Sequence, residues 1–495
     1  MRRRGRPKRT ARAATTVAAD AGAAAVAATA VRVAKGMATA RSIGEGGLRA
    51  ALSRQRRLGI EAVIVIGLLA LGAFLIVHFV VKTIKNTRPL GGANVVITRG
   101  HVANENEASF TIDPSRATTI VGAANDLTSY TSLNDGRTWR RAAPPRLPVG
   151  SCALHAPRMA WVGTTQVLAF LASTPCGDDI TPYIVVSTRD GVSGRWSEAR
   201  RITPPAWRYG FDDAPSIAAD PARKIVYLAW SRGLTAHTEG TVVSRSDDEG
   251  RTWSKPLVVA PNADEPHLPT IAVAPNGDVY VGGIDNRHGI WVARSADHGR
   301  TFSEPSQVGH LRANPSATCS VAAQQPLPKE ETSCSGPNPT LLATNAGPLV
   351  VYDDVGVNRT QDVVIAGPKF ATTVPPPDKG KTQQFFPAAA VDPQTGVLWA
   401  CWYDTTFDPN AHRAWFTCSA SRDGRTWTPP ERAAATPTDV SDLLTDLASA
   451  NGFYPSVTAA AGNAHPFWIG VDPVTFQQEI VTATFSERDA FALKP

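Results

Sequence analysis

The sequence predicts an all-β fold, a β-propeller of four-stranded blades, preceded by one transmembrane helix. Three observations support this: a recurring Ser-x-Asp-x-Gly-x-Thr-Trp motif, a second recurring turn around a proline, and one long apolar segment before them. The chain has 495 residues with 39 glycines and 39 prolines, and 19% of its residues are charged. This composition is typical of a turn-rich globular protein and not of a coiled coil.

The first 59 residues are basic and rich in alanine. They hold 14 Lys and Arg against 2 Asp and Glu, or +12, so the rest of the +7 chain has 36 against 41, or −5. Segment 1–59 has too few large apolar residues for a core, so we expect it to be disordered and cytoplasmic. The mildly acidic remainder argues against a nucleic-acid partner.

Residues 60–82 are predicted to form a transmembrane signal anchor. Within them, 62–81 is a run of 20 residues that is apolar apart from His78, and such a length crosses roughly 30 Å of hydrocarbon. Basic residues are denser before the run than after it, which places the N-terminus in the cytoplasm. A cleaved signal peptide would have a shorter apolar region and a cleavage site. We therefore expect a single-pass cell-membrane protein with a linker at 83–92 and an extracytoplasmic domain at 93–495.

Six cysteines all follow the predicted anchor. An even number in an oxidising compartment predicts three disulfides, and pairing in sequence order is the simplest connectivity. No cluster of Cys and His has the spacing of a metal site. The cysteines are Cys152, Cys176, Cys319, Cys334, Cys401 and Cys418.

The recurring motif has the spacing of a repeat architecture. We call each copy a box turn, and the five copies are residues 132–139, 187–196, 246–253, 295–302 and 421–427. Their glycines, Gly136, Gly191, Gly250, Gly299 and Gly424, are 55, 59, 49 and 125 residues apart, and the last interval spans two units. Turns at Pro114, Pro221, Pro275 and Pro393 repeat with the same period. A period of about 50 residues is typical of propeller blades.

Seven units begin near residues 108, 157, 214, 269, 339, 386 and 454. In the fourth, we predict strands at 269–275, 278–285, 289–296 and 301–308, with a tight turn at Asn276–Gly277. The seventh unit lacks a fourth strand, and we expect Ala93–Gly100 to supply it and close the ring. Six blades remain the alternative if the first unit is something else.

A box turn is expected to be structural. Short Ser and Asp side chains hydrogen-bond to the backbone of the turn, and glycine permits a positive φ. The aromatic residue packs the turn on its blade. The residues given this structural role are Ser132, Ser246, Asp248, Gly250, Trp253, Ser295, Asp297 and Gly299.

These motifs resemble the Asp-box, or BNR, repeats of the sialidase-like superfamily, over roughly residues 93–495. The resemblance implies that the box turns join the third and fourth strands, on the face opposite the binding site. The loops of that opposite face carry acidic, aromatic and basic side chains. Their candidate ligand-binding residues are His155, Arg158, Asp213, Asp264, His267, Asp285, Asp354, Tyr403 and Asp404. Asp and Asn are also common at strand ends because they favour turns.

The resemblance also raises the question of sialidase activity. Sialidases use three arginines, an acidic Asp, and a Tyr nucleophile paired with a Glu. The family's Phe/Tyr-Arg-Ile-Pro opening is absent, since 155–160 places its Arg after its Pro. The catalytic candidates are Tyr454, Glu265 and Asp212.

The preferred hypothesis is a membrane-anchored propeller that binds a glycan, a cell-wall polymer or a cell-surface protein through the face opposite the box turns. Aromatic residues would stack on sugar rings, and carboxylates would accept hydrogen bonds from hydroxyls or hold calcium. The alternative is an exo-α-sialidase or another glycoside hydrolase.

Overall fold

The computed structural model describes residues 93–99, 107–174, 176, 181–202, 212–235, 238–263, 268–284, 289–312, 325–327, 330–335, 339–355, 360–374, 382–408, 413–439, 454–471 and 477–492. All of them belong to Arg88–Pro495, the second of two units of the chain. Within these ranges, no helix combines the length and apolar character needed to span a membrane. The predicted anchor and segment 1–59 lie outside the described residues.

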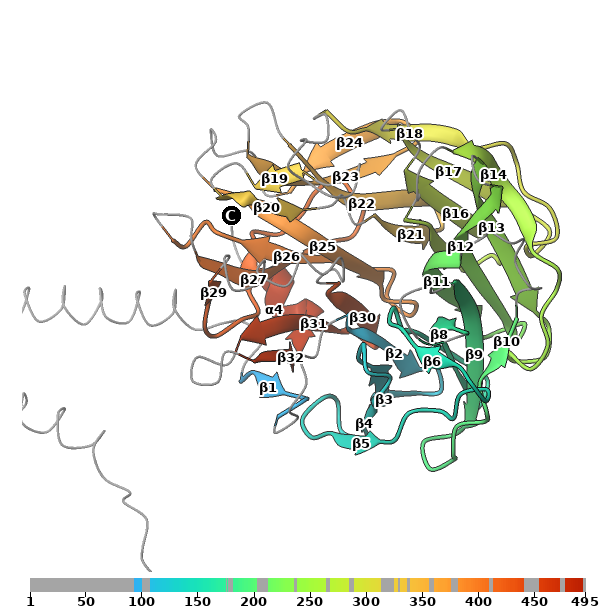
Figure 1. Cartoon of the computed structure of the whole chain (residues 1–495). Coiled ribbons are helices and arrows are strands. Elements are labelled where there is room, and N and C mark those ends of the chain that lie inside the picture. Colours follow the sequence, from blue (N-terminus) through green and yellow to red (C-terminus); the bar gives the residue numbers. More distant parts are fainter. Residues whose placement is uncertain are drawn as a thin grey trace, which may run out of the picture. The chain divides into compact units, whose positions relative to one another are not determined.

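Seven antiparallel sheets follow one another around a central axis as the blades of a propeller (Figure 1). The seven-blade prediction is therefore confirmed. Blade 1 is β2 (Ser109–Asp113), β3 (Arg116–Ala123), β4 (Ser129–Ser132) and β5 (Arg140–Ala142); blade 2 is β7 (Arg158–Val162), β8 (Thr165–Ser173), β9 (Pro182–Asp190) and β10 (Arg200–Arg201), with β6 (Cys152–Ala153) beside β8; blade 3 is β11 (Asp212–Asp220), β12 (Ile225–Thr235), β13 (Thr238–Ser246) and β14 (Leu257–Ala263).

The remaining blades have the same order, with small additions. Blade 4 is β15 (Thr270–Val273), β16 (Val279–Ile284), β17 (Gly289–Ser295) and β18 (Ser306–His310); blade 5 is β21 (Thr340–Thr344), β22 (Gly347–Val355), β23 (Gln361–Gly367) and β24 (Phe370–Thr373); blade 6 is β25 (Gln384–Val391), β26 (Leu398–Asp404), β27 (Arg413–Ser421) and β28 (Glu431–Arg432), with β29 (Thr438–Asp439) beside β27; blade 7 is β30 (Ser456–Ala460), β31 (Asn463–Val471), β32 (Gln478–Thr482) and β1 (Val95–Val96), with β33 (Phe485–Ser486) beside β31. A hairpin of β19 (Gln325–Leu327) and β20 (Glu330–Ser335) and a short helix, α4 (Glu487–Ala492), complete the described elements.

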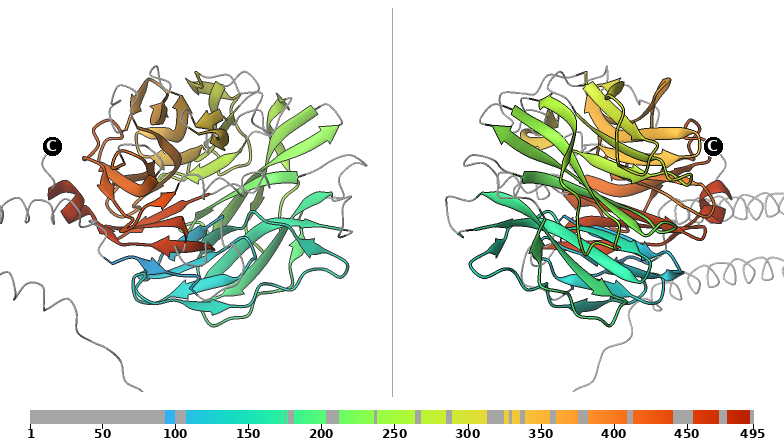
Figure 2. Two further views of the ribbon diagram at one scale, coloured as in Figure 1. Left: turned by 60° about the vertical axis from the view of Figure 1, so that its left-hand side comes forward. Right: turned by 90° about the vertical axis from the view of Figure 1, so that its right-hand side faces the viewer.

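The ring closes as predicted, by pairing the first strand with the last blade. Val95 and Val96 of β1 pair antiparallel with Thr482 and Val481 of β32, and the Ile97 amide donates to the Ile480 carbonyl at 2.8 Å. The first strands of successive blades contact one another all round, from β2 to β7, β11, β15, β21, β25, β30 and back to β2. Figure 2 shows the same stacking of twisted sheets from two other directions.

The core lies between successive sheets. Apolar side chains of each sheet interdigitate with those of the next, so that Trp230 and Trp399 are almost completely buried. A second contact closes the ring at its outer turns: His465 Nε2 of blade 7 lies 3.0 Å from Asp135 Oδ1 of blade 1. This contact with His465 lowers the pKa of Asp135.

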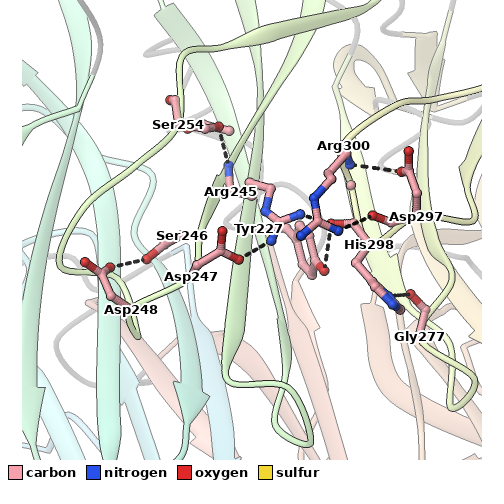
Figure 3. A network of polar contacts seen from close by, with 12 residues as sticks. Tyr227, Arg245, Ser246, Asp247, Asp248, Ser254, Gly277, Asp297, His298 and Arg300 are labelled. Atoms are coloured by element: carbon pink, nitrogen blue, oxygen red, sulfur yellow. Dashed lines mark hydrogen bonds and ion pairs between the residues drawn. The ribbon is translucent and has the colours of Figure 1, made fainter.

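The box turns have the expected internal hydrogen bonds. In blade 3, the Ser246 hydroxyl donates to Asp248 and accepts from the Gly250 amide, both at 2.8 Å (Figure 3 draws the Ser246–Asp248 bond). The Thr252 amide and hydroxyl donate to the same carboxylate at 2.7 and 2.6 Å, and the Trp253 indole donates to the Gly250 carbonyl at 3.1 Å. Asp248 is thus fully engaged within its own turn, and hydrogen bonds from Thr252 and Ser246 keep its pKa low although burial opposes them.

The fourth strand of blade 4 differs from the prediction. It spans Ser306–His310 instead of 301–308. The preceding residues are held in the box turn, since the Thr301 hydroxyl donates to Asp297 at 2.6 Å and the Ser303 amide donates to the Arg294 carbonyl. Residues from Thr301 that the sequence assigns to the fourth strand therefore belong to the box turn.

Among the described residues, two disulfides are present, and both join cysteines in sequence order. Cys152 pairs with Cys176 in blade 2. Cys401 pairs with Cys418 between β26 and β27, where the two residues are direct cross-strand partners. Cys319 lies outside the described residues, and the side chain of Cys334 is not described.

Candidate functional site

The central cavity lies where the first strands of the blades begin. It has a volume of about 250 Å³ and is lined by residues at or just before the start of β2, β7, β11, β15, β21, β25 and β30. Because strands alternate in direction within a blade, first strands begin on one face and third strands end on the other. The box turns follow the third strands, so the cavity opens on the face opposite them.

A belt of prolines and hydroxyls forms the rim of this cavity. Five first strands have a proline directly before them or as their fourth residue, and all five prolines line the cavity: Pro215, Pro269, Pro339, Pro387 and Pro455. The next residue carries a hydroxyl in most of these strands, and it often bonds to the following blade: Thr270 accepts from the Leu341 amide at 3.0 Å and Ser216 from the Ile271 amide at 3.2 Å. The rim is therefore rigid and shared between neighbouring blades.

The backbone at this rim is strained. Five residues that enter first strands have positive φ, although none of them is glycine: Glu107, Ala156, Ala214, Leu268 and Phe386. Four of them precede a proline, a position that normally favours extended backbone. Such strain costs about 1–3 kcal/mol per residue and clusters at functional sites.

Glu107 is the most deeply buried charged group of the site, with 1% of its surface exposed. Its carboxylate accepts a hydrogen bond from the Ala156 amide at 2.5 Å, and the Nδ1 atom of His155 lies 3.6 Å away. Burial raises the pKa of Glu107, while the charges of His155 and Arg158 oppose that rise. The protonated form of Glu107 is thus favoured relative to a carboxyl in water.

Arg158 and Tyr454 form the next pair. The guanidinium of Arg158 lies over the ring of Tyr454, 5.5 Å from its centroid, and its Nη1 donates to the Pro157 carbonyl at 2.8 Å. Burial, together with the negative charges of Glu107 and Asp213, raises the pKa of Tyr454, and Arg158 partly offsets this. Tyr454 therefore acts at neutral pH as a neutral hydrogen-bonding phenol.

Asp213 supplies a second carboxylate to the cavity. The pairing of β11 with β12 shifts register between Asp213 and Ser216, and such an irregularity re-aims a side chain. The Ala214 amide donates to Asp213 Oδ1 at 2.7 Å, which fixes the orientation of the carboxylate. Unlike Glu107, Asp213 is only partly buried.

The structure brings together four of the predicted residues, His155, Arg158, Asp213 and Tyr454, at the cavity. Glu107 also belongs to this group, and sequence reasoning missed it. The signal was available, because Glu107 stands just before the first strand of its blade, as His155 and Asp213 stand at the start of theirs.

The other described candidates lie inside the blades and do not line the cavity. Asp212 is 0% exposed, accepts from the Trp230 indole at 2.8 Å and lies 3.7 Å from Arg232 Nε. Asp354 is buried and accepts from the Arg312 amide at 3.0 Å.

Tyr403 and Asp404 are buried in the same way. The Tyr403 hydroxyl donates to the Ile469 carbonyl at 2.8 Å in the next blade. Asp404 accepts from Gln384 at 3.1 Å, and burial raises its pKa. Asp264, Glu265, His267 and Asp285 lie outside the described residues. Over the ranges described, no group of three His, Cys, Asp or Glu side chains has the geometry to hold a metal ion.

Comparison with known proteins gives likenesses of fold only. No family model matches the chain, and no curated protein is significantly similar to it. Among solved structures, the microbial sialidase Hz136 from a Hadza source is 14% identical, with 76% of this chain and 75% of that one covered and a TM-score of 0.41. A protein of unknown function from Dyadobacter fermentans is 14% identical over 79% and 97% of the two chains, with a TM-score of 0.43.

A third solved structure, Ycf48 bound to a D1 peptide, is 10% identical over 81% of this chain and 97% of that one, with a TM-score of 0.42. At such identities and TM-scores, these proteins lend no argument about ligand or activity. The seven-blade assignment stands on the strand pairing of this chain.

Proposed function

We propose that the central cavity binds the end of a glycan. The observation that carries this proposal is the convergence of polar groups from separate blades on one cavity: Glu107 from blade 1, Arg158 from blade 2, Asp213 from blade 3 and Tyr454 from blade 7. A cavity of about 250 Å³ is smaller than the roughly 300–1,000 Å³ of pockets for drug-sized ligands. It is suited to one terminal unit of a longer molecule.

The mixture of groups fits a polyhydroxylated ligand. Asp213 accepts hydrogen bonds, Arg158 donates them, and the Tyr454 phenol can do both. Charges of both signs lie side by side, so a strongly charged ligand of one sign would be repelled by part of the lining. Sugar hydroxyls can satisfy both kinds of partner. Calcium, if it takes part, would bind through the carboxylates.

We further propose that residues 62–81 anchor the chain in the cell membrane with the propeller outside. This placement would let the central cavity meet a cell-surface glycan. Support comes from the apolar run and its flanking charges, together with two disulfides, which form in oxidising compartments. Proteolysis of intact cells tests this: a protease added outside should remove the propeller and leave residues 1–59 protected. Resistance of the propeller in intact cells would contradict it.

A glycan array probed with the full-length protein tests the binding proposal. Arg158→Ala should lose at least about tenfold in affinity for any glycan that binds the parent, since a hydrogen bond to a charged group contributes roughly 1.5–3 kcal/mol. Arg251→Ala, an exposed arginine on the other face, serves as the matched control and should bind like the parent. Equal loss in both variants, or binding that survives Arg158→Ala, would refute the cavity as the site.

Glycoside hydrolysis is the second candidate, because Tyr454 lines the same cavity as two carboxylates, Glu107 and Asp213. Tyr454 would be the nucleophile, Glu107 its base and Asp213 the acid; Glu265 stays a sequence-based candidate for the base. A fluorogenic sialoside assay with Tyr454→Phe tests this, and turnover that disappears in the variant would support it. A parent protein without turnover leaves binding as the function.

A further inference from the structure

Four of the five box turns are held by the blade before them. In the junction of blades 3 and 4, the carbonyl of His298 accepts hydrogen bonds from the Tyr227 hydroxyl at 3.3 Å and from Arg245 Nη1 at 2.7 Å (Figure 3). The next residue, Gly299, lies on the Tyr227 ring, where an added Cβ would be 2.7 Å from a ring carbon. We call the surface formed by Tyr227 and Arg245 a turn socket, and a left-handed Xaa-Gly pair fills it.

Equivalent contacts, made by other side chains, recur around the ring. In the box turn of blade 3, Glu249, the residue before Gly250, accepts from the Thr165 hydroxyl of blade 2 at 2.8 Å. Asp135 Oδ1 of blade 1 lies 3.0 Å from His465 Nε2 of blade 7. An added Cβ on Gly424 would be 2.5 Å from Leu349 of blade 5. In each case the box turn of one blade covers the second strand of the preceding blade.

Blade 6 is followed by a blade without a box turn, because the fourth strand of blade 7 is β1. Its socket position is nevertheless covered by the chain itself. Trp399 occupies the place of Tyr227, since its cross-strand partner Ala420 precedes the serine of a box turn, as Arg245 does. The Phe485 ring lies 5.9 Å from Trp399, and α4 follows it.

Blade 4 repeats the residues of the blade 3 socket. Tyr280 and Arg294 are cross-strand partners, as Tyr227 and Arg245 are, and Arg294 precedes Ser295 as Arg245 precedes Ser246. The following blade cannot fill this socket with a box turn, because its third and fourth strands pair as close as Gly367 with Phe370 and leave two residues between them. A turn of that length does not reach across.

A cavity of about 410 Å³ lies at this socket, lined by Tyr280, Arg294, Thr344, Pro348 and Pro368 among others. The side chain of Arg294 is 53% exposed, whereas that of Arg245 is 9% exposed under its box turn. Asp278 engages Arg294 through Nε at 2.9 Å and Nη2 at 2.7 Å. The Arg294 guanidinium also interacts with the Tyr280 hydroxyl, so the two polar groups of the socket lie together beside the cavity.

We propose that the blade 4 socket binds an Xaa-Gly peptide turn of a partner protein. The turn's Xaa carbonyl accepts hydrogen bonds from Tyr280 and Arg294, and its glycine lies on the Tyr280 ring. A peptide is the expected occupant because the equivalent side chains, Tyr227 and Arg245, hold such a turn one blade earlier. A glycan has no such counterpart, and in a second copy of the chain this box turn already fills its own blade 3 socket.

The test uses a fluorescent peptide, Ser-Ala-Asp-His-Gly-Arg-Thr-Phe, which is the sequence of the turn that fills the blade 3 socket. Fluorescence anisotropy with the full-length protein should show saturable binding. Arg294→Ala should weaken it about tenfold or more, because a hydrogen bond from a charged donor is lost. Arg251→Ala is the matched control, since its side chain is 52% exposed, and should leave binding unchanged.

Two further measurements keep the result decisive. Tyr280→Phe retains the ring and removes only the hydroxyl, so it should fold and bind more weakly. A peptide with Ala in place of Gly should lose binding, because a Cβ would strike the ring and disfavour the left-handed turn. Absence of binding by the parent up to millimolar peptide would overturn the proposal. So would equal binding of the two peptides, or loss in Arg158→Ala instead of Arg294→Ala, which would place the peptide in the central cavity.

Discussion

At the scale of single residues, the box turns show how one motif carries two tasks. Ser246 and Asp248 form hydrogen bonds with the turn's own backbone. Glu249 and Gly250 pack on the previous blade. Glycine is needed here for two reasons that the motif alone does not separate. It has a positive φ, and it lies against another blade at a distance that excludes a Cβ.

Substitution of two glycines separates these reasons. Gly299→Ala should destabilise the protein by about 1–2 kcal/mol from its positive φ of 79° and by a further 1–3 kcal/mol from the clash with Tyr227. Gly396→Ala has a similar φ of 74° but no atom within 4 Å of the added Cβ, so it should show the first cost alone. Urea unfolding measures both, and equal losses would contradict the packing argument.

Glu107 gives a prediction about pH. Its pKa in the folded protein is raised above 4.5 by burial, so folding favours its protonated form. The free energy of unfolding of the parent should therefore fall as pH rises from 4.5 through the folded pKa. Glu107→Gln keeps an acceptor for the Ala156 amide but has no charge, so it escapes this loss.

Urea unfolding of Glu107→Gln and of the parent at several pH values checks this. The variant should gain stability over the parent as pH rises and then level off, and it should bind glycan more weakly. A carboxyl kept where it lowers stability is expected of a functional group. If the stability difference between Glu107→Gln and the parent did not change with pH, burial would not favour the protonated form of Glu107.

At the scale of elements, the sequence predicts the repeat well because turns are local. Box spacing and proline turns place the starts of all seven units correctly, and β1 supplies the strand that blade 7 lacks, as predicted. Side-chain direction at the second-strand ends could not be predicted, because it depends on the packing between blades. Tyr403 and Asp404 are the last two residues of β26, which is buried along its whole length, so they lie in the interior.

The closure by β1 can be tested with one residue. Ile97→Pro removes the amide that donates to Ile480 and should destabilise the protein by about 3 kcal/mol or more. Ile97→Val retains the amide and most of the buried side chain, so it should cost about 0.5–1.5 kcal/mol. Similar thermal unfolding of the two variants would mean that β1 does not hold blade 7.

At the scale of the whole molecule, the ring divides the surface into two faces with different tasks. The box turns of one face join blades, while the first strands open on the other into a cavity that several blades line. The sequence predicts this division because strand direction alternates within each blade. The place of Glu107 just before β2 can also be read from the sequence, but its burial against Ala156 cannot, because that contact joins residues 49 positions apart.

Hydrogen–deuterium exchange of the full-length protein, with and without a glycan that binds it, shows which face of the ring the ligand covers. The account predicts slower exchange on binding in the peptides around Glu107, His155, Asp213 and Tyr454, and unchanged exchange in the box turns. Protection confined to the box turns, with the cavity peptides unchanged, would contradict it.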